Sequence, residues 1–201
     1  MRKVTWILLI LCFLQSCTSS KHKEDQQYFD EFYTVLDNLI RFNLHDVSVI
    51  SAEILPVYKT IDSISESSPM MYHVLHLQYF DLLKKRYFLD TLDASFMYNS
   101  IDSVKTFEID SNRISIPVIN KKDMVEFFSS GIYDGYDKIN ETYGTSCFIR
   151  VTRPIFNSNY TKMILFIDYF CGPLWGQGYQ YFLIKKDGNW KIIDEGVTWE
   201  S

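Results

Sequence analysis

The stretch "KMILFIDYFCGPLWGQGYQYFLIKKDGNWKIIDEGVTW", Lys162–Trp199, decides the fold. It holds three runs rich in apolar and aromatic residues, separated by a glycine-rich segment and by the dipeptide Asp187-Gly188, a strong indication of a hairpin turn. A fourth run, Cys147–Pro154, precedes them, and the polar stretch "NSNY" connects it to the first. Strands joined by short connections pair with their neighbours in sequence, so residues 147–199 predict an antiparallel β-meander.

The residues before Cys147 have mostly helical patterns. Four segments show apolar residues at helical spacing or a residue typical of a helix N-cap. They are residues 24–44, 67–88 with a cap at Ser67, 91–101 with a cap at Thr91, and 120–143 with a cap at Asn120 and interruptions at Gly131 and Gly135. Val47–Tyr58 is rich in β-branched residues and predicts a strand that Pro56 ends at a sheet edge. The expected fold class is α+β, with a helical part at about 28–143 packed on a curved, cone-like meander at about 147–199.

The N-terminus has the organisation of a secretion signal. Arg2 and Lys3 precede the uncharged apolar run Val4–Leu14, which is too short to span a bilayer stably. "LQSC", Leu14–Cys17, resembles the lipobox of bacterial lipoproteins, which implies cleavage before Cys17 and its acylation; an ordinary secretory signal is the alternative. Two or more acyl chains anchor a protein stably to a bilayer. The expected division is a signal peptide over 1–16, a lipidated cysteine and polar tether over 17–27, and a single domain over 28–201.

Composition and charge bear on location and partners. Removing Arg2 and Lys3 from the 20 basic residues leaves 18 against 25 acidic ones, a net charge of −7. Sequence-independent binding to nucleic acids needs basic patches, so no nucleic-acid partner is expected. The expected location is the bacterial cell envelope, at the outer membrane, with the bilayer as the partner of acylated Cys17. An envelope protein or a glycan is the further partner considered, and no cofactor is expected.

Cys147 and Cys171 are predicted to form a disulfide. With Cys12 cleaved off and Cys17 acylated, they are the remaining thiols of a chain in an oxidising compartment. A turn centred on Asn159 places the two cysteines directly opposite each other, near the Cα separation that a disulfide requires.

The glycine-rich segment "CGPLWGQGY", Cys171–Tyr179, is interpreted as a bend between strands. A phosphate-binding loop precedes a helix, whereas Gly176 and Gly178 precede a strand-like run. A catalytic Cys171 needs a histidine base, and no histidine stands in a recognisable motif. The glycines are therefore expected to permit positive φ angles in a sharp turn. Trp175 either stacks on a sugar or partner protein, or folds back over the end of the sheet.

A row of polar residues across the meander is the candidate binding site. The register that opposes the two cysteines also opposes Arg150 to Asp168, a favourable pair. A symmetric glycine loop places Tyr181 opposite Asp168, and a hairpin centred on Asp187-Gly188 places Asp194 opposite Tyr181. These four side chains would line one face, as ligand-binding residues do in cone-shaped folds similar to nuclear transport factor 2. The alternative is a hydrogen-bonded structural cluster.

One family resemblance involves the end of the chain. "RPIFN", "CGPLWGQGYQYFLIKKDGNWKI" and the terminal "WES" resemble the C-terminal half of uncharacterised lipoproteins from Bacteroidetes-type bacteria. That pattern is a strand, a C-G-x-L-C-G-x-G-type loop and a hairpin with a G-x-W turn. It covers roughly the last sixty residues, and Trp175 stands where a second cysteine is common. The resemblance implies an envelope lipoprotein and carries no activity.

These observations lead to two functional hypotheses. The first is a lipid-anchored, non-catalytic binding or assembly-support module, because no motif combines a nucleophile, a base and a group that orients them. The alternative is a small envelope hydrolase that uses the carboxylates of Asp168 and Asp194. His73 and His76 stand three residues apart, but no third ligand can be placed, so no metal site is expected.

Overall fold

The structure, a computed structural model, describes residues 25–42, 44, 47–59, 73–86, 88–102 and 107–201. The expected signal peptide, Cys17 and the expected helix cap Ser67 lie outside the described residues. Within the described ranges no helix is long and apolar enough to cross a membrane. Residues 25–27, expected in the tether, already belong to a helix that continues to residue 42.

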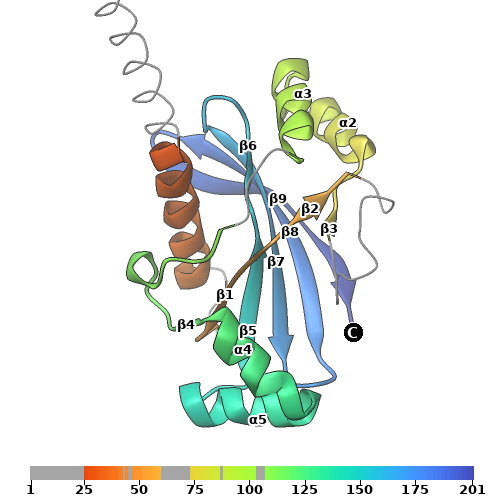
Figure 1. Cartoon of the computed structure of the whole chain (residues 1–201). Helices are drawn as coiled ribbons and strands as arrows, with labels where there is room; N and C mark the ends of the chain where they lie inside the picture. The colour runs from red at the N-terminus through yellow and green to blue at the C-terminus, as the bar shows by residue number, and fades with distance from the viewer. Residues whose placement is uncertain (1–24, 43, 45–46, 60–72, 87, 103–106) are drawn as a thin grey trace, which may run out of the picture.

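Within the described residues, a seven-stranded sheet forms the centre of the molecule (Figure 1). Its strands follow the order β4-β1-β5-β7-β8-β9, and β6 pairs with β7. Their bounds are β1 Ile50–Leu55, β4 Val118–Ile119, β5 Cys147–Thr152, β6 Ile155–Phe156, β7 Lys162–Cys171, β8 Gly176–Lys186 and β9 Asn189–Glu200. Strands β5, β7, β8 and β9 are antiparallel neighbours, which confirms the predicted meander and the α+β class.

The strand predicted over Val47–Tyr58 forms, but its place in the sheet differs from the expectation. Pro56 divides it into β1 and the two-residue strand β2, Val57–Tyr58. Strand β1 is internal, because it pairs in parallel with both β4 and β5. Strand β2 pairs in parallel with β3, His73–Val74, as a separate two-stranded sheet.

Helices cover both faces of the sheet. The N-terminal helix, residues 25–42, lies on one face, and the other helices lie toward the opposite face as two groups at its two ends (Figure 1). Their bounds are α2 Leu77–Lys85, α3 Thr91–Ser100, α4 Lys121–Phe127 and α5 Ile132–Tyr143, with 3₁₀ turns η2 at Ser111–Arg113 and η3 at Phe128–Ser130. The helix expected from residue 67 begins only at Leu77, because His73–Val74 are taken up by β3.

Capping residues account for several helix boundaries. The Asn120 side chain accepts a hydrogen bond of 2.8 Å from the backbone N–H of Asp123, which confirms the predicted cap of α4. Helix α3 is capped by Asp90 rather than by Thr91. Gly131, at φ 137°, separates η3 from α5 as expected. Gly135 does not interrupt α5; a Cβ there would lie 2.3 Å from the ring of Phe128, so the glycine serves packing.

Adjacent residues of strand β7 pack into different hydrophobic clusters, on opposite faces of the sheet. Leu165 in β7 packs in the cluster between the sheet and the N-terminal helix, and Phe166 packs in the cluster formed with α2 and α3. Phe148 in β5 belongs to a third cluster, formed with α5. A strand with side chains buried on both faces reads as a continuous apolar run, and β7 does so from Met163 to Ile167. On this face of the sheet a pocket opens between the α4–α5 group and β2.

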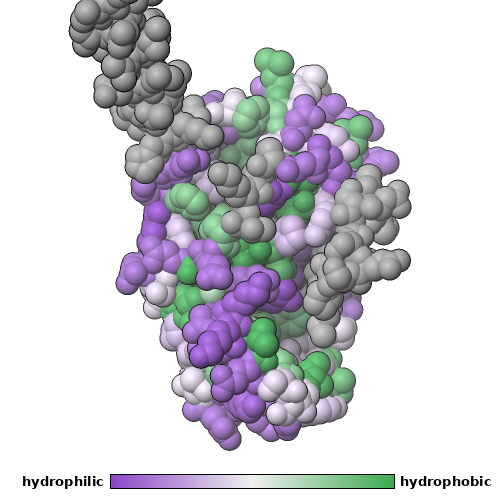
Figure 2. Space-filling view, in the orientation of Figure 1, coloured by the Kyte–Doolittle hydropathy of each residue, from purple (hydrophilic) through white to green (hydrophobic). Residues whose placement is uncertain are grey.

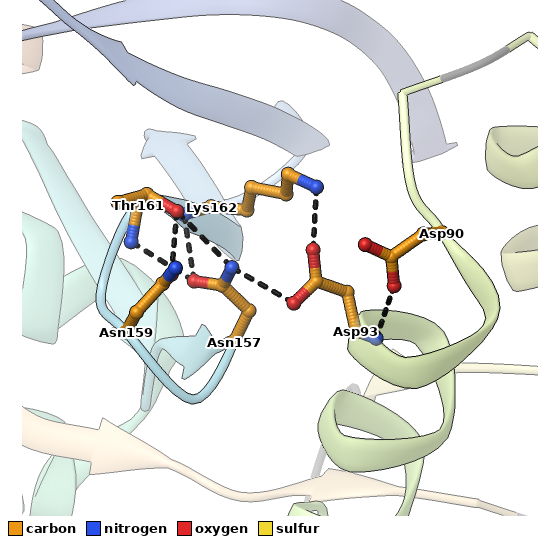
Figure 3. A network of polar contacts seen from close by, with 6 residues as sticks. All are labelled: Asp90, Asp93, Asn157, Asn159, Thr161 and Lys162. Carbon is orange, nitrogen blue, oxygen red and sulfur yellow. Dashed lines mark hydrogen bonds and ion pairs between the residues drawn. The ribbon is translucent and has the colours of Figure 1, made fainter.

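A polar network fastens α3 to the turn between β6 and β7 (Figure 3). Asp93 accepts hydrogen bonds from the Nδ2 of Asn157, at 3.0 Å, and from the Nζ of Lys162. Asn157, only 1% exposed, also accepts from the backbone N–H groups of Thr161 and Lys162 through its Oδ1. Buried amides need such partners. The "NSNY" turn is thereby held by side-chain bonds.

Candidate functional site

The register of the first long hairpin is the one predicted. Cys147 lies opposite Cys171, and Arg150 lies opposite Asp168. The two cysteines form a disulfide with a Cα–Cα distance of 4.2 Å. Because paired residues in antiparallel strands point to the same face, Arg150 and Asp168 share the face that carries α2 to α5.

Asp168 is a fully buried carboxylate whose hydrogen-bond partners come from far away in the chain. Its Oδ1 accepts from the Nε2 of His73 at 2.9 Å and from the Nε1 of Trp199 at 2.8 Å. His73 is itself 4% exposed and stacks on Phe166, with 4.4 Å between ring centroids. Arg150, predicted to be the partner of Asp168, makes no hydrogen bond to it in the described part of the chain. The Oδ2 of Asp168 has no hydrogen-bond partner among the described residues.

The histidines do not form a metal site. His73 lies in β3 and donates to Asp168, whereas His76 is the exposed residue before α2. Among the described residues no group of three histidine, cysteine or acidic side chains is placed to hold a metal ion.

The glycines of β8 make room for Trp199. Gly178 lies opposite Asp168 on one side and opposite Trp199 on the other. A Cβ at Gly178 would lie 2.1 Å from the Nε1 of Trp199, and one at Gly176 would lie 2.8 Å from its ring. The indole therefore crosses the two glycines to reach Asp168. The expectation of positive φ angles holds only for Gly172, at φ 89°, since the other two are strand residues.

The four-residue polar row does not form. Tyr181 lies opposite Leu165 and Glu195 and points to the face of the N-terminal helix. The bend between β7 and β8 is centred on Pro173, so Asp168 lies opposite Gly178 and not opposite Tyr181. A β-bulge between Phe182 and Leu183 then shifts the last hairpin by one residue, which is enough to change the expected pairing.

Asp194 lies on the face of Asp168 but at a different place on it. It lies opposite Phe182, which lies opposite Ile164, four residues from Asp168 along β7. Four residues of strand correspond to roughly 13 Å. Asp194 accepts from the Nη1 of Arg86 at 2.6 Å and from the hydroxyl of Tyr79 at 3.4 Å. The two carboxylates are thus separately engaged and do not form a pair.

A pocket of ≈ 510 Å³ opens on this face, between α4–α5 and β2. Its walls come from β1, β2, the α4–α5 corner, β5, β7 and the loop after Cys171. The aromatic part of the lining consists of Tyr58, Phe128, Tyr136, Phe148, Phe170 and Trp175. Val125 in α4 and Ile132 in α5 are exposed. Figure 2 shows hydrophobic side chains at the surface at the lower end of the view, where α4 and α5 lie. We refer to this cavity as the aromatic pocket.

Trp175 forms part of the pocket wall. It is 46% exposed, and its ring meets that of Tyr169 edge to face, with centroids 5.2 Å apart. Its backbone carbonyl accepts from the N–H of Cys171, which closes the bend between β7 and β8. Trp175 therefore folds back onto the end of the sheet and still presents aromatic surface to the pocket.

Arg150 and Glu53 are the charged side chains of the described pocket lining. The Nη2 of Arg150 lies 3.9 Å from the Oε2 of Glu53, which is too long for a hydrogen bond. Glu53 is half-exposed and lies 3.5 Å from the Nζ of Lys121. Burial lowers the pKa of Arg150, and the nearby carboxylates of Glu53 and Asp168 partly offset this effect.

Two side chains of this pocket were predicted from the sequence, and the others were not. Arg150 and Trp175 line the aromatic pocket, whereas Asp168 is not part of its described lining and Tyr181 and Asp194 lie elsewhere. The alternation in β5 and β7 places Phe148 and Phe170 on the same face as Arg150, and this could have been read from the predicted register. Glu53 carries no such signal, because the parallel pairing of β1 with β5 is not local.

Comparison of the chain with protein-family models, with curated proteins and with solved structures finds no match. Functional conclusions therefore rest on the chemistry of the aromatic pocket.

Proposed function

We propose that the protein is a lipid-anchored module of the bacterial envelope that binds an apolar molecule, or an apolar group of a larger partner, in the aromatic pocket. The observation that carries the proposal is the pocket itself. Its ≈ 510 Å³ falls within the roughly 300–1,000 Å³ typical of small-molecule sites. Walls made mostly of aliphatic and aromatic residues, with few polar groups, are also typical of such sites.

The composition of the pocket supports binding without catalysis. Its described lining contains no histidine and no cysteine, so no nucleophile with an imidazole base is assembled there. His73 is engaged with Asp168 and is buried against Phe166. The hydrolase hypothesis receives no support from Asp168 and Asp194, because the two carboxylates have separate partners and lie apart on the sheet.

Binding of a neutral fluorescent naphthylamine, N-phenyl-1-naphthylamine, tests the proposal. The chain from residue 18 serves for this purpose, since it keeps every described residue and all three core clusters. We expect an increase in fluorescence that saturates at one site. Ile132→Asp places a charge in the half-exposed pocket wall and should weaken binding at least tenfold, because a carboxylate is costly to desolvate.

Leu92→Asp is the matched control. Leu92 is 84% exposed, lies outside the pocket and, like Ile132, belongs to the first turn of a helix. Its replacement should leave binding unchanged. An absence of saturable binding, or equal losses in the two variants, would contradict the proposed pocket function.

A further inference from the structure

We propose that the ligand of the aromatic pocket is an apolar monocarboxylic acid whose carboxylate pairs with the guanidinium of Arg150. This inference rests on the proposed binding function of the pocket and adds the chemical class of the ligand.

The first argument is the unused donor capacity of Arg150. Its side chain is only 18% exposed and lines the pocket. A guanidinium has five N–H donors. No side-chain or backbone acceptor of the described residues takes a hydrogen bond from it, and the ion pair with Glu53 spans 3.9 Å. A guanidinium that faces a pocket and has no acceptor among the described residues favours a ligand that supplies one, because hydrogen bonds between two charged groups are strong.

The second argument concerns the two carboxylates around Arg150. Asp168 uses its Oδ1 for His73 and Trp199, both of which are held by packing. Glu53 is half-exposed and has Lys121 as an alternative partner, nearer than Arg150. An incoming carboxylate can therefore take the guanidinium while Glu53 remains with Lys121. The displaced contact is a long, partly solvated ion pair, and such pairs contribute little.

The third argument is the geometry of recognition. A planar guanidinium binds a carboxylate through two parallel N–H···O bonds, which neither an alcohol nor an amine can reproduce. A cationic ligand would be repelled by Arg150. Phe148 and Phe170 pair with each other two residues further along the strands and on the same face of the sheet, so the remainder of the ligand meets aromatic surface. An apolar body with one carboxylate end matches both parts of the pocket.

Calorimetric titration with decanoate and with 1-decanol at pH 7.5 separates this inference from the general binding function. We expect decanoate to bind at least tenfold more tightly than decanol. Arg150→Gln should weaken decanoate at least tenfold and change decanol less than twofold. Glu53→Gln should tighten decanoate severalfold, because it removes the carboxylate that competes for Arg150.

Glu195→Gln is the matched control for charge removal, since Glu195 is exposed on β9 and lies opposite Tyr181. It should leave decanoate binding unchanged. Equal affinities for decanoate and decanol would overturn the carboxylate inference and leave the proposed function intact, whereas binding of neither would overturn both. If Arg150→Gln fails to fold by circular dichroism, the half-exposed Glu53→Gln decides: unchanged or weaker decanoate binding overturns the inference.

Discussion

Asp168 shows how a buried charge is maintained within an apolar strand. It lies between Ile167 and Tyr169 in β7 and is 0% exposed. A lone carboxylate in this place would be too costly, so the donors of His73 and Trp199 are needed for stability. One of these donors is separated from Asp168 by 95 residues, which links the β2–β3 pair to the centre of the sheet.

Replacing His73 tests the importance of this donor. His73→Phe keeps an aromatic ring stacked on Phe166 and removes the Nε2–H that Asp168 accepts. We expect the free energy of unfolding to fall by about 1.5–3 kcal/mol, the range for a hydrogen bond to a charged group. Urea denaturation measures the change.

His76→Phe is the control, because His76 is exposed and its side chain makes no cap hydrogen bond to α2. It should change stability by less than about 0.5 kcal/mol. Equal effects of the two replacements would show that His73 does not stabilise Asp168.

At the level of elements, the glycines of β8 accommodate a side chain from the neighbouring strand β9. These glycines leave a gap on one face, and the indole of Trp199 from β9 fills that gap. Because the indole then reaches Asp168 in β7, one side chain connects three neighbouring strands. A glycine within a strand often marks such a close approach.

Gly178→Ala tests this arrangement. The new Cβ would lie 2.1 Å from the Nε1 of Trp199, so the indole must move away from Asp168. We expect a loss of about 1–3 kcal/mol, as for overpacking in a core, measured by thermal unfolding. Tryptophan fluorescence should report the displaced ring.

Gly196→Ala in β9 is the matched control, since nothing lies within 4 Å of a Cβ built there. It should not destabilise the protein, and its φ angle is not in the positive region. If both alanine variants unfold at the wild-type temperature, the close approach of Trp199 to β8 is not important for stability.

For the whole molecule, the proposed anchor bears on the direction in which the pocket faces. The N-terminal helix begins at the end of the molecule opposite α4 and α5, which form one wall of the pocket (Figure 1). An anchor at Cys17 would therefore hold the pocket end away from the bilayer. A ligand would then reach the pocket from the solvent side.

Cys17→Ala tests the anchor itself. Without the thiol no acyl chain can be attached, so the protein should remain uncleaved or become soluble, as measured by membrane fractionation and the mass of the chain. Cys12→Ala is the matched control, because Cys12 lies within the apolar run and should be removed with the signal peptide. A Cys17→Ala protein that still fractionates with membranes as a mature species would contradict the lipoprotein hypothesis.

The sequence by itself determined the local features of the meander. Turn residues and apolar runs were sufficient to predict its strands, the opposition of Arg150 to Asp168 and the disulfide between Cys147 and Cys171. The cap at Asn120 was predictable for the same reason. A turn and its flanking residues are neighbours along the chain, so their chemistry sets the pairing without help from other parts of the fold.

Only the tertiary structure decided what surrounds those strands. A single bulge between Phe182 and Leu183 helped to separate Tyr181 from Asp194, and a bulge depends on how the whole sheet twists and packs. The hydrogen bond from His73 to Asp168 and the ion pair between Glu53 and Arg150 join segments that are far apart in the sequence. The spacing of residues along the chain does not predict such contacts. The aromatic pocket arises from such contacts, because its walls come from elements that meet only when the parallel strand β1 docks beside β5.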